Sequence, residues 1–191
     1  VVATTAGPYT LYGNSVVEFC AKFGSHYVDI TGEVDWVQAM VSQWQETAQE
    51  SGAKMISFCG HDSIPWDLSV MKLQDVLREE SNDDLTSVTF WNESRGMAPG
   101  GTLATAFVYL EGKAIKAPRA EFDPFLRLPD GSKSSYKDTV NLPKFIEKST
   151  SPWETPSTPR YTVPFVMAMV NSKVCRWSHA LRDIGSTSLV Y

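Results

Sequence analysis

The chain has 191 residues, of which 17 are Lys or Arg and 22 are Asp or Glu, so its formal net charge at pH 7 is −5. Its 42% apolar and 20% charged residues are typical of a globular protein and exclude a wholly disordered chain. The acidic balance argues against a nucleic-acid partner, because general nucleic-acid binders carry a basic excess. No apolar run reaches the roughly 20 residues that span a bilayer.

The first part of the chain alternates between strand and helix patterns. β-branched and apolar residues predict strands over 1–6, 27–30 and 54–59. Apolar residues at helical spacing predict helices over about 16–23, 37–48 and 67–80. Asn14 or Ser15 would cap the first helix, and Gly24 and Gly52 would end the first two. Strands joined by helices pair in parallel through right-handed crossovers. We therefore interpret residues 1–80 as the C-terminal half of a Rossmann-like parallel sheet.

Residues 81–191 lack the regular alternation of strand and helix patterns and are assigned to a second domain. They predict a strand over 86–92, a glycine-containing loop over 96–101 and a helix over 102–111 that Gly112 ends. A long irregular excursion over 113–160 follows, then an apolar segment over 161–172 and a helix over 174–181. Because the chain opens inside a strand, we interpret it as a central fragment of a larger protein.

Ligands bind open parallel sheets at the carboxyl ends of the strands. Three predicted loops meet this description, over 6–13, 31–33 and 60–65, and each combines glycine with a polar or aromatic residue. The candidate cofactor-binding residues are Gly7, Pro8, Tyr9, Gly13, Thr31, Gly32 and Gly60. The alternative is that glycine and proline merely form turns at these positions.

Carboxylates cluster near the same predicted edge, at Asp29, Glu33, Asp62 and Asp67. Paired carboxylates serve acid–base chemistry when burial raises the pKa of one of them. The alternative is that Glu33 or Asp35 satisfies the amides of a helix first turn, and that Asp67 does the same for its own helix. We assign no catalytic residue.

Gly100, Gly101 and Thr102 precede a predicted helix, whose exposed amides could hold a carboxylate or phosphate. Together with Asp62 they are the candidate substrate-binding residues, although a loop with a threonine cap is the commoner explanation for the first three. Arg176 and Trp177 could bind an anion or a partner, but such a pair is commonly one exposed and one packed residue of a helix.

The three cysteines and three histidines are scattered, at positions 20, 59 and 175 and at 26, 61 and 179. They match neither a disulfide framework nor a metal-ligand spacing, so we expect no metal site and reduced, mostly buried thiols. We expect a cytoplasmic protein, with peripheral membrane association left open. The G-x-G-x-x-G phosphate loop of dinucleotide-binding domains is missing, so this chain alone should not hold a dinucleotide tightly.

Three passages carry a family resemblance. They are Ala6–Gly13 continuing through Gly24–Glu33, then Gly60–Leu68, and Pro164–Met167 with Asn171, Val174 and Arg176. Together they resemble the saccharopine dehydrogenase-like oxidoreductases, a group that includes the trans-acting enoyl reductases. Ser63-Ile64-Pro65 departs from the turn of true saccharopine reductases and argues against saccharopine as substrate.

The resemblance implies an NAD- or NADP-binding Rossmann domain followed by a second α/β domain with a mixed sheet. The Gly7–Tyr9 loop would lie along the cofactor toward its nicotinamide end, and Gly100–Thr102 would face the cleft. The resemblance transfers no catalytic residue.

Two functions remain open on these grounds. The first is the central part of an NAD(P)-dependent oxidoreductase that moves hydride to or from a small-molecule or lipid-like substrate, the isolated fragment being inactive. The second is a non-catalytic binding or scaffold protein that has kept the fold. Half a parallel sheet exposes an apolar face and a strand edge, so we also expect a homo-oligomer, or association with the missing N-terminal segment.

Overall fold

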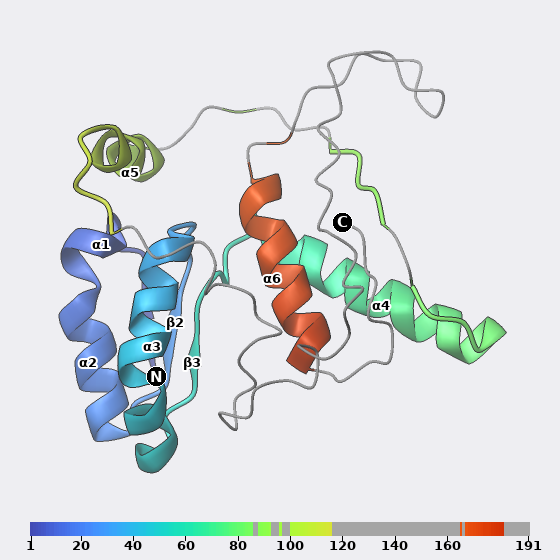
Figure 1. The fold of residues 1–191 in the computed structure, drawn as a ribbon, viewed down its shortest axis with the longest axis horizontal. Helices are drawn as coiled ribbons and strands as arrows, with labels where there is room; N and C mark the ends of the chain where they lie inside the picture. Colours follow the sequence, from blue (N-terminus) through green and yellow to red (C-terminus); the bar gives the residue numbers. More distant parts are fainter. Residues whose placement is uncertain (86–87, 93–95, 97–99, 116–164, 166, 182–191) are drawn as a thin grey trace, which may run out of the picture. The chain divides into compact units, whose positions relative to one another are not determined.

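A computed structural model describes residues 1–85, 88–92, 96, 100–115, 165 and 167–181 (Figure 1). These residues form an α/β structure that divides into two compact units. Unit 1 contains the described residues of 1–64 and 94–122, and unit 2 those of 65–93 and 123–191. The predicted division at residue 80 stays a prediction, as does the fragment interpretation.

Unit 1 is built on a three-stranded parallel sheet. Its strands β1 (Val2–Thr4), β2 (Tyr27–Asp29) and β3 (Met55–Ile56) stand in the order β1-β2-β3. The register pairs Thr4 with Asp29, and Val28 with Ile56. The predicted strands therefore exist and run side by side in the predicted direction, although each is shorter than the residue pattern indicates.

Helices α2 (Asn14–Phe23) and α3 (Val34–Ser51) connect the strands and lie side by side on one face of the sheet (Figure 1). Both helices occupy the same face because the strand order advances in one direction through crossovers of one hand. Gly24 and Gly52 end them in the left-handed conformation, at φ 68° and 77°, as the sequence predicts.

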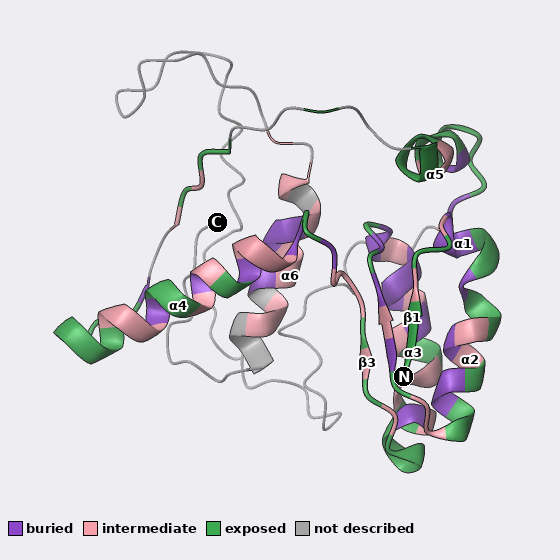
Figure 2. Ribbon diagram, turned by 180° about the vertical axis from the view of Figure 1, so that it is seen from behind, coloured by how far each residue is buried: buried purple, intermediate pink, exposed green. Residues whose placement is uncertain are grey.

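The core of unit 1 lies between these helices and the sheet. It is an apolar cluster of Tyr9, Val17, Cys20, Tyr27, Trp36, Val37 and Met40. Figure 2 shows buried residues on α3 where it lies behind the sheet and exposed residues along the outer side of α2. In contrast, Ile56 of β3 is exposed and its partner Val28 is half-buried, on the face of the sheet opposite Tyr27 and Met55.

The start of the helical region differs from the prediction. A short helix α1 (Tyr9–Tyr12) precedes α2, and Gly13 is the N-cap residue of α2. Asn14 does not cap α2 with its side chain but accepts a hydrogen bond from the indole of Trp36, at 2.7 Å. Sequence spacing misses α1 because a single helical turn has no periodicity to detect.

Helix α5 (Gly100–Leu110) also belongs to unit 1 and begins two residues before its predicted start. Gly100 and Gly101 are thus the first residues of the helix and not part of a loop. Leu103, Phe107 and Leu110 are exposed on one stripe of α5, while Val108 is buried on another.

Unit 2 contains α4 (Ile64–Ser81) and α6 (Ala168–Leu181). Both helices begin earlier than predicted, α4 because Pro65 is well suited to a helix first turn. Val70, Leu85 and Cys175 form its buried cluster. The predicted strand over 86–92 is wrong for residues 88–92, which form no regular element, and 86–87 lie outside the described residues.

The described residues of unit 2 contain no strand, so the mixed sheet of a second domain is not seen in them. Nearly all of the predicted excursion over 113–160, residues 161–164 and 166 of the predicted apolar segment and the Arg176 side chain lie outside the described residues. Nowhere in the described parts of the chain is a helix long and apolar enough to cross a membrane.

Candidate functional site

The candidate site is the carboxyl edge of the sheet in unit 1. Because the strands are parallel, β1, β2 and β3 all end at this edge, after Thr4, Asp29 and Ile56. The loops that follow them are therefore neighbours. The loop after β2 is the central one. Glu33 in this loop bonds to the segment after β1, and Asp29 at the end of β2 bonds to the segment after β3.

Glu33 joins the β2 loop to the loop after β1. Its side chain is buried, at 1% exposure, and both of its oxygens accept hydrogen bonds. Oε1 accepts the Tyr9 amide at 2.7 Å, while Oε2 accepts the Thr10 amide at 2.9 Å and the Thr10 hydroxyl at 2.7 Å. Glu33 thereby satisfies first-turn amides of α1 that have no partner within the helix.

Asp29 joins the β2 loop to the loop after β3. It is buried at 1% exposure and accepts hydrogen bonds from the Ser57 hydroxyl at 3.0 Å and the Phe58 amide at 3.1 Å. The Thr31 amide and the Tyr27 hydroxyl also donate to it, at 3.0 and 2.9 Å. Burial raises the pKa of Asp29, and these hydrogen bonds act in the opposite direction.

Phe58 has a left-handed backbone at φ 62°, which is rare for a residue with a bulky side chain. Its amide is one of the donors to Asp29. Strained residues of this kind persist where surrounding bonds fix them, and they concentrate at functional sites. The loop after β3 is thus held in a defined conformation by the same carboxylate that closes β2.

Tyr9 bridges the ends of β1 and β2. Its hydroxyl donates to the Thr4 carbonyl at 3.0 Å and accepts the Ile30 amide at 3.4 Å. Its ring packs on Trp36, with centroids 5.4 Å apart, and burial raises the pKa of the phenol. The side chain of Tyr9 is therefore part of the edge's framework, and a ligand would meet the backbone around it.

The loops at the carboxyl edge of unit 1 contain no basic side chain other than histidine. The loops over 5–13, 30–33 and 57–63 contain no Lys or Arg, whereas Lys22 ends α2 and Lys54 precedes β3 at the opposite edge. The carboxyl edge holds buried Asp29 and Glu33. This edge suits a neutral, hydroxyl-bearing or cationic group and disfavours a phosphate.

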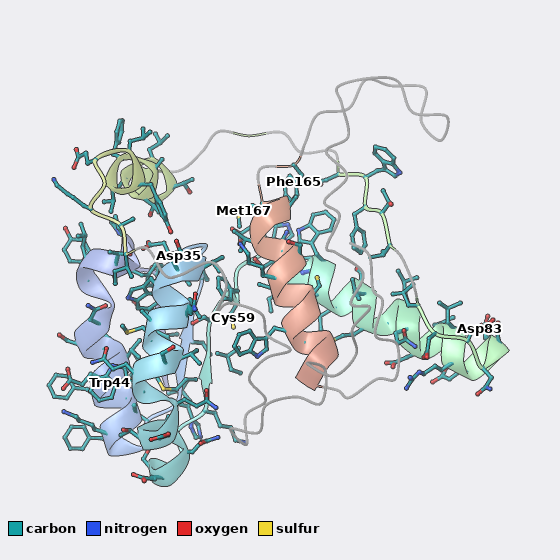
Figure 3. All side chains as sticks on the ribbon, in the orientation of Figure 1. Asp35, Trp44, Cys59, Asp83, Phe165 and Met167 are labelled. Atoms are coloured by element: carbon teal, nitrogen blue, oxygen red, sulfur yellow. The ribbon has the colours of Figure 1, made fainter. Side chains whose placement is uncertain are left out.

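Helix α5 lies over the loop after β1 (Figure 1). The Thr105 hydroxyl of α5 is 3.4 Å from Glu33 Oε1. A Cβ on Gly7 would lie 4.0 Å from the same Thr105 hydroxyl. Asp35, labelled in Figure 3, lies in the first turn of α3. The pKa of Tyr109 on α5 is raised to about 12, mainly by burial and to a smaller extent by the negative charges of Asp35 and Glu33. The structure thus brings the candidate substrate helix to the candidate cofactor loop.

The predicted cofactor residues differ in exposure. Gly32 is exposed and Gly7 is half-buried, so their backbones are open to a ligand. Pro8, Tyr9, Thr31 and Gly60 are buried at the same edge. Gly13 is buried away from the strand ends, where a Cβ would collide with the Trp36 ring, so packing alone accounts for glycine at that position.

The predicted substrate residues are all exposed. Gly100, Gly101 and Thr102 form the first turn of α5, and a Cβ on either glycine would meet nothing within 4 Å. Asp62 lies exposed in the turn that leads from Gly60 into α4. Its carboxylate is close enough to Gly60 that a Cβ there would collide with it.

Asp67 belongs to unit 2 and does not cap its helix. It is 8% exposed, its Oδ2 accepts the Ser178 hydroxyl at 2.8 Å, and its Oδ1 has no hydrogen-bond partner among the described residues. Burial raises the pKa of this carboxyl, and the Ser178 bond partly offsets that effect. Trp177 is half-buried on α6.

The described residues contain no group of three or more His, Cys, Asp or Glu side chains that could hold a metal ion. None of the three cysteines, all within the described residues, forms a disulfide. Cys20 and Cys175 are buried, and Cys59, which is labelled in Figure 3, is half-buried.

The chain is similar to mycobacterial trans-acting enoyl reductases. It is 34% identical over 187 residues to a Mycobacterium tuberculosis protein named "Putative trans-acting enoyl reductase". It is 32% identical to the trans-acting enoyl reductase of Mycobacterium ulcerans and 31% identical to that of Mycobacterium bovis, again over 187 residues. Each alignment covers 96% of this chain but only 44% of the relative.

The chain thus spans less than half the length of the curated relatives it matches. No family model matches it, and no solved structure does. The similarity supports the oxidoreductase part of the sequence interpretation and covers 96% of the chain.

Sequence reasoning missed how the edge is held together. The sequence suggested that Glu33 accepts hydrogen bonds from the first-turn amides of the helix that follows it. In the structure Glu33 instead accepts the first-turn amides of α1, which lie 23 and 24 residues earlier in the chain. Thr10, Phe58 and Thr105 were not singled out at all. The acidic residues at 29 and 33 were a usable signal of these bonds. A buried carboxylate that has no cation beside it needs hydrogen-bond donors from other segments of the chain.

Proposed function

We propose that the carboxyl edge of unit 1 binds the nicotinamide half of NAD or NADP, as part of an oxidoreductase that reduces an enoyl group on a lipid-like substrate. The observation that carries this proposal is the ordered edge itself. Asp29 at the end of β2 and Glu33 in the loop after it fix the loops after all three parallel strands. The similarity to trans-acting enoyl reductases supports the reaction class.

The residues present fit one half of a dinucleotide better than the other. Exposed backbone at Gly32 and small side chains at Thr5 and Ala6 leave room for a flat ring and a ribose. The absence of a cation from the loops and the missing phosphate loop both disfavour the pyrophosphate here. The Rossmann-like interpretation therefore assigns the phosphates to residues outside this chain.

A bound reduced nicotinamide would supply hydride to the substrate. The part of the chain described here would contribute the backbone that orients the ring, and α5 would lie beside it. Leu103, Phe107 and Leu110 give α5 an apolar exposed stripe that suits the aliphatic part of a lipid-like substrate. No residue is assigned to proton transfer.

One observation favours the second candidate, a non-catalytic binding protein. All four oxygens of Asp29 and Glu33 are occupied by hydrogen bonds, so neither carboxylate is poised to donate or accept a proton. A cytoplasmic location and a homo-oligomer formed through the exposed sheet face are further proposals, the latter supported by the exposure of Ile56.

The test uses the protein expressed from its complete gene. NADH and NADPH are titrated by fluorescence, and oxidation of the bound nucleotide is then followed after addition of a long-chain enoyl thioester. Binding with turnover supports the enoyl reductase. Binding without turnover of any enoyl substrate favours the non-catalytic alternative, and no binding at millimolar nucleotide contradicts both the cofactor and the reaction.

A further inference from the structure

We propose that Glu33 is a positioning residue, whose carboxylate sets the conformation of the Gly7–Thr10 segment and through it the seat of the nicotinamide ring. This inference rests on the proposed function for the identity of the ligand. It assigns to Glu33 a role apart from contact with ligand or acid–base chemistry, because the side chain is 1% exposed.

The contacts at Glu33 are specific for a carboxylate. One oxygen accepts the Tyr9 amide at 2.7 Å, and the other accepts two donors from Thr10 at 2.9 and 2.7 Å. Both oxygens act only as acceptors, so an amide side chain would turn a donor toward a donor. Hydrogen bonds to charged groups are the stronger class, and an unpaired buried donor is costly.

Position 33 is also where three segments of unit 1 meet. The Glu33 amide donates to the Thr31 hydroxyl at 3.0 Å, which anchors the residue in its own loop. The carboxylate holds the start of α1, and the Thr105 hydroxyl of α5 approaches it at 3.4 Å. Displacing this carboxylate would therefore release the loop after β1 and its contact with α5 together.

The first measurement needs no nucleotide. Amide hydrogen exchange of Tyr9 and Thr10 is followed by NMR in the wild-type protein and in Glu33→Gln. Exchange at one or both amides should accelerate about tenfold, as expected for the loss of one hydrogen bond, while amides in the middle of α3 stay protected. Glu46→Gln, an exposed carboxylate on α3, is the matched control and should change nothing.

The second measurement separates position from charge. Glu33→Asp keeps the charge but is one methylene too short to reach both amides. A positioning role predicts that Glu33→Asp and Glu33→Gln both weaken binding of the preferred reduced nucleotide about tenfold. Binding of the adenine half of that nucleotide, without its nicotinamide riboside, should not change. A role through charge predicts that Glu33→Asp binds like wild type, which would overturn the proposal.

Thr10→Val keeps the test available if the Glu33 variants fail to fold. It removes only the hydroxyl bond to Oε2 and should weaken nucleotide binding a few-fold, with faster exchange of the Thr10 amide. Unchanged exchange and unchanged affinity in Thr10→Val, or in a folded Glu33→Gln, contradict the inference. If the wild-type protein binds neither nucleotide, the proposed function fails, whereas the exchange result still shows whether Glu33 holds the segment.

Discussion

Single polar side chains fix the loops at the carboxyl edge of unit 1. Asp29, Glu33 and Tyr9 each join segments that are at least five residues apart in sequence, and each is buried. Hydrogen bonds of this kind contribute modestly when made and are expensive to leave unmade. Substitutions that remove one partner and keep the shape are therefore the informative ones.

Tyr9→Phe removes the hydroxyl that bridges Thr4 and Ile30 but leaves the ring packed on Trp36. We expect the free energy of unfolding to fall by about 1 kcal/mol, because a part-buried carbonyl loses its donor. Urea denaturation monitored by circular dichroism measures the change. Tyr12→Phe, on an exposed tyrosine of the same helix, is the control, and equal stabilities of the two variants would show that the bridge contributes nothing.

Asp67 makes a pH-dependent contribution to unit 2. Because burial raises its pKa from 3.8, the folded chain holds this proton to a higher pH than the unfolded chain does. The stability associated with Asp67 is complete below the unfolded pKa and is lost as the pH rises through the folded pKa. An ionised Asp67 with an unpaired Oδ1 is thus a liability at neutral pH.

Asp67→Asn should therefore stabilise the protein at pH 7, by about 1 kcal/mol, because it removes a buried negative charge while a neutral polar atom still occupies the Oδ1 position. The amide oxygen can still accept the Ser178 hydroxyl. Thermal unfolding at pH 7 and pH 3.5 measures the difference, which should vanish at the lower pH. Glu79→Gln, exposed on the same helix, should show no such pattern, and a destabilised Asp67→Asn at pH 7 would contradict the account.

At the scale of elements, close packing decides which glycines matter. α1 and α2 meet at Gly13, whose missing side chain leaves room for the Trp36 ring. The Gly13 amide also donates to the Tyr9 carbonyl at 2.7 Å, and a Cβ on Gly13 would lie 2.8 Å from that oxygen. Neither neighbour can retreat, because one is buried and the other is backbone.

Gly13→Ala should destabilise the protein by about 1–3 kcal/mol through overpacking against Trp36. Gly101→Ala is the matched control, because its Cβ would meet nothing within 4 Å and its position in α5 should gain up to about 1 kcal/mol in helix propensity. Denaturant unfolding of both variants gives the comparison. A Gly13→Ala protein as stable as wild type would mean that α1 and α2 pack differently.

The strands and the two crossover helices of unit 1 could be predicted from sequence because their signals are local. Apolar spacing marks α2 and α3, and Gly24 and Gly52 mark their ends. The strand over 88–92 was wrong because β-formers become a strand only where another strand pairs with them. The bond from Glu33 to Tyr9 spans 24 residues, and no local pattern contains it.

At the scale of the whole molecule, the parallel direction of β1, β2 and β3 creates the candidate site at the carboxyl edge. It gathers the loops after the three strands on one side and leaves the basic residues Lys22 and Lys54 on the other. The place of the candidate cofactor loops at the carboxyl edge was predictable to this extent, since strand ends and glycines put them there, while their role in binding stays a prediction. The exposure of the residues in these loops could not be predicted, because it depends on helices from other parts of the chain that pack against the loops.

The most direct test of the central claim is hydrogen-exchange mass spectrometry of the protein expressed from its complete gene, with and without saturating reduced nucleotide. We predict slower exchange in the segments over 5–10 and 30–33. Exchange at 24–26 and 52–54, on the opposite edge of the same sheet, should not change. Bound nucleotide with no protection at the carboxyl edge, or with protection confined to the opposite edge, would contradict the account.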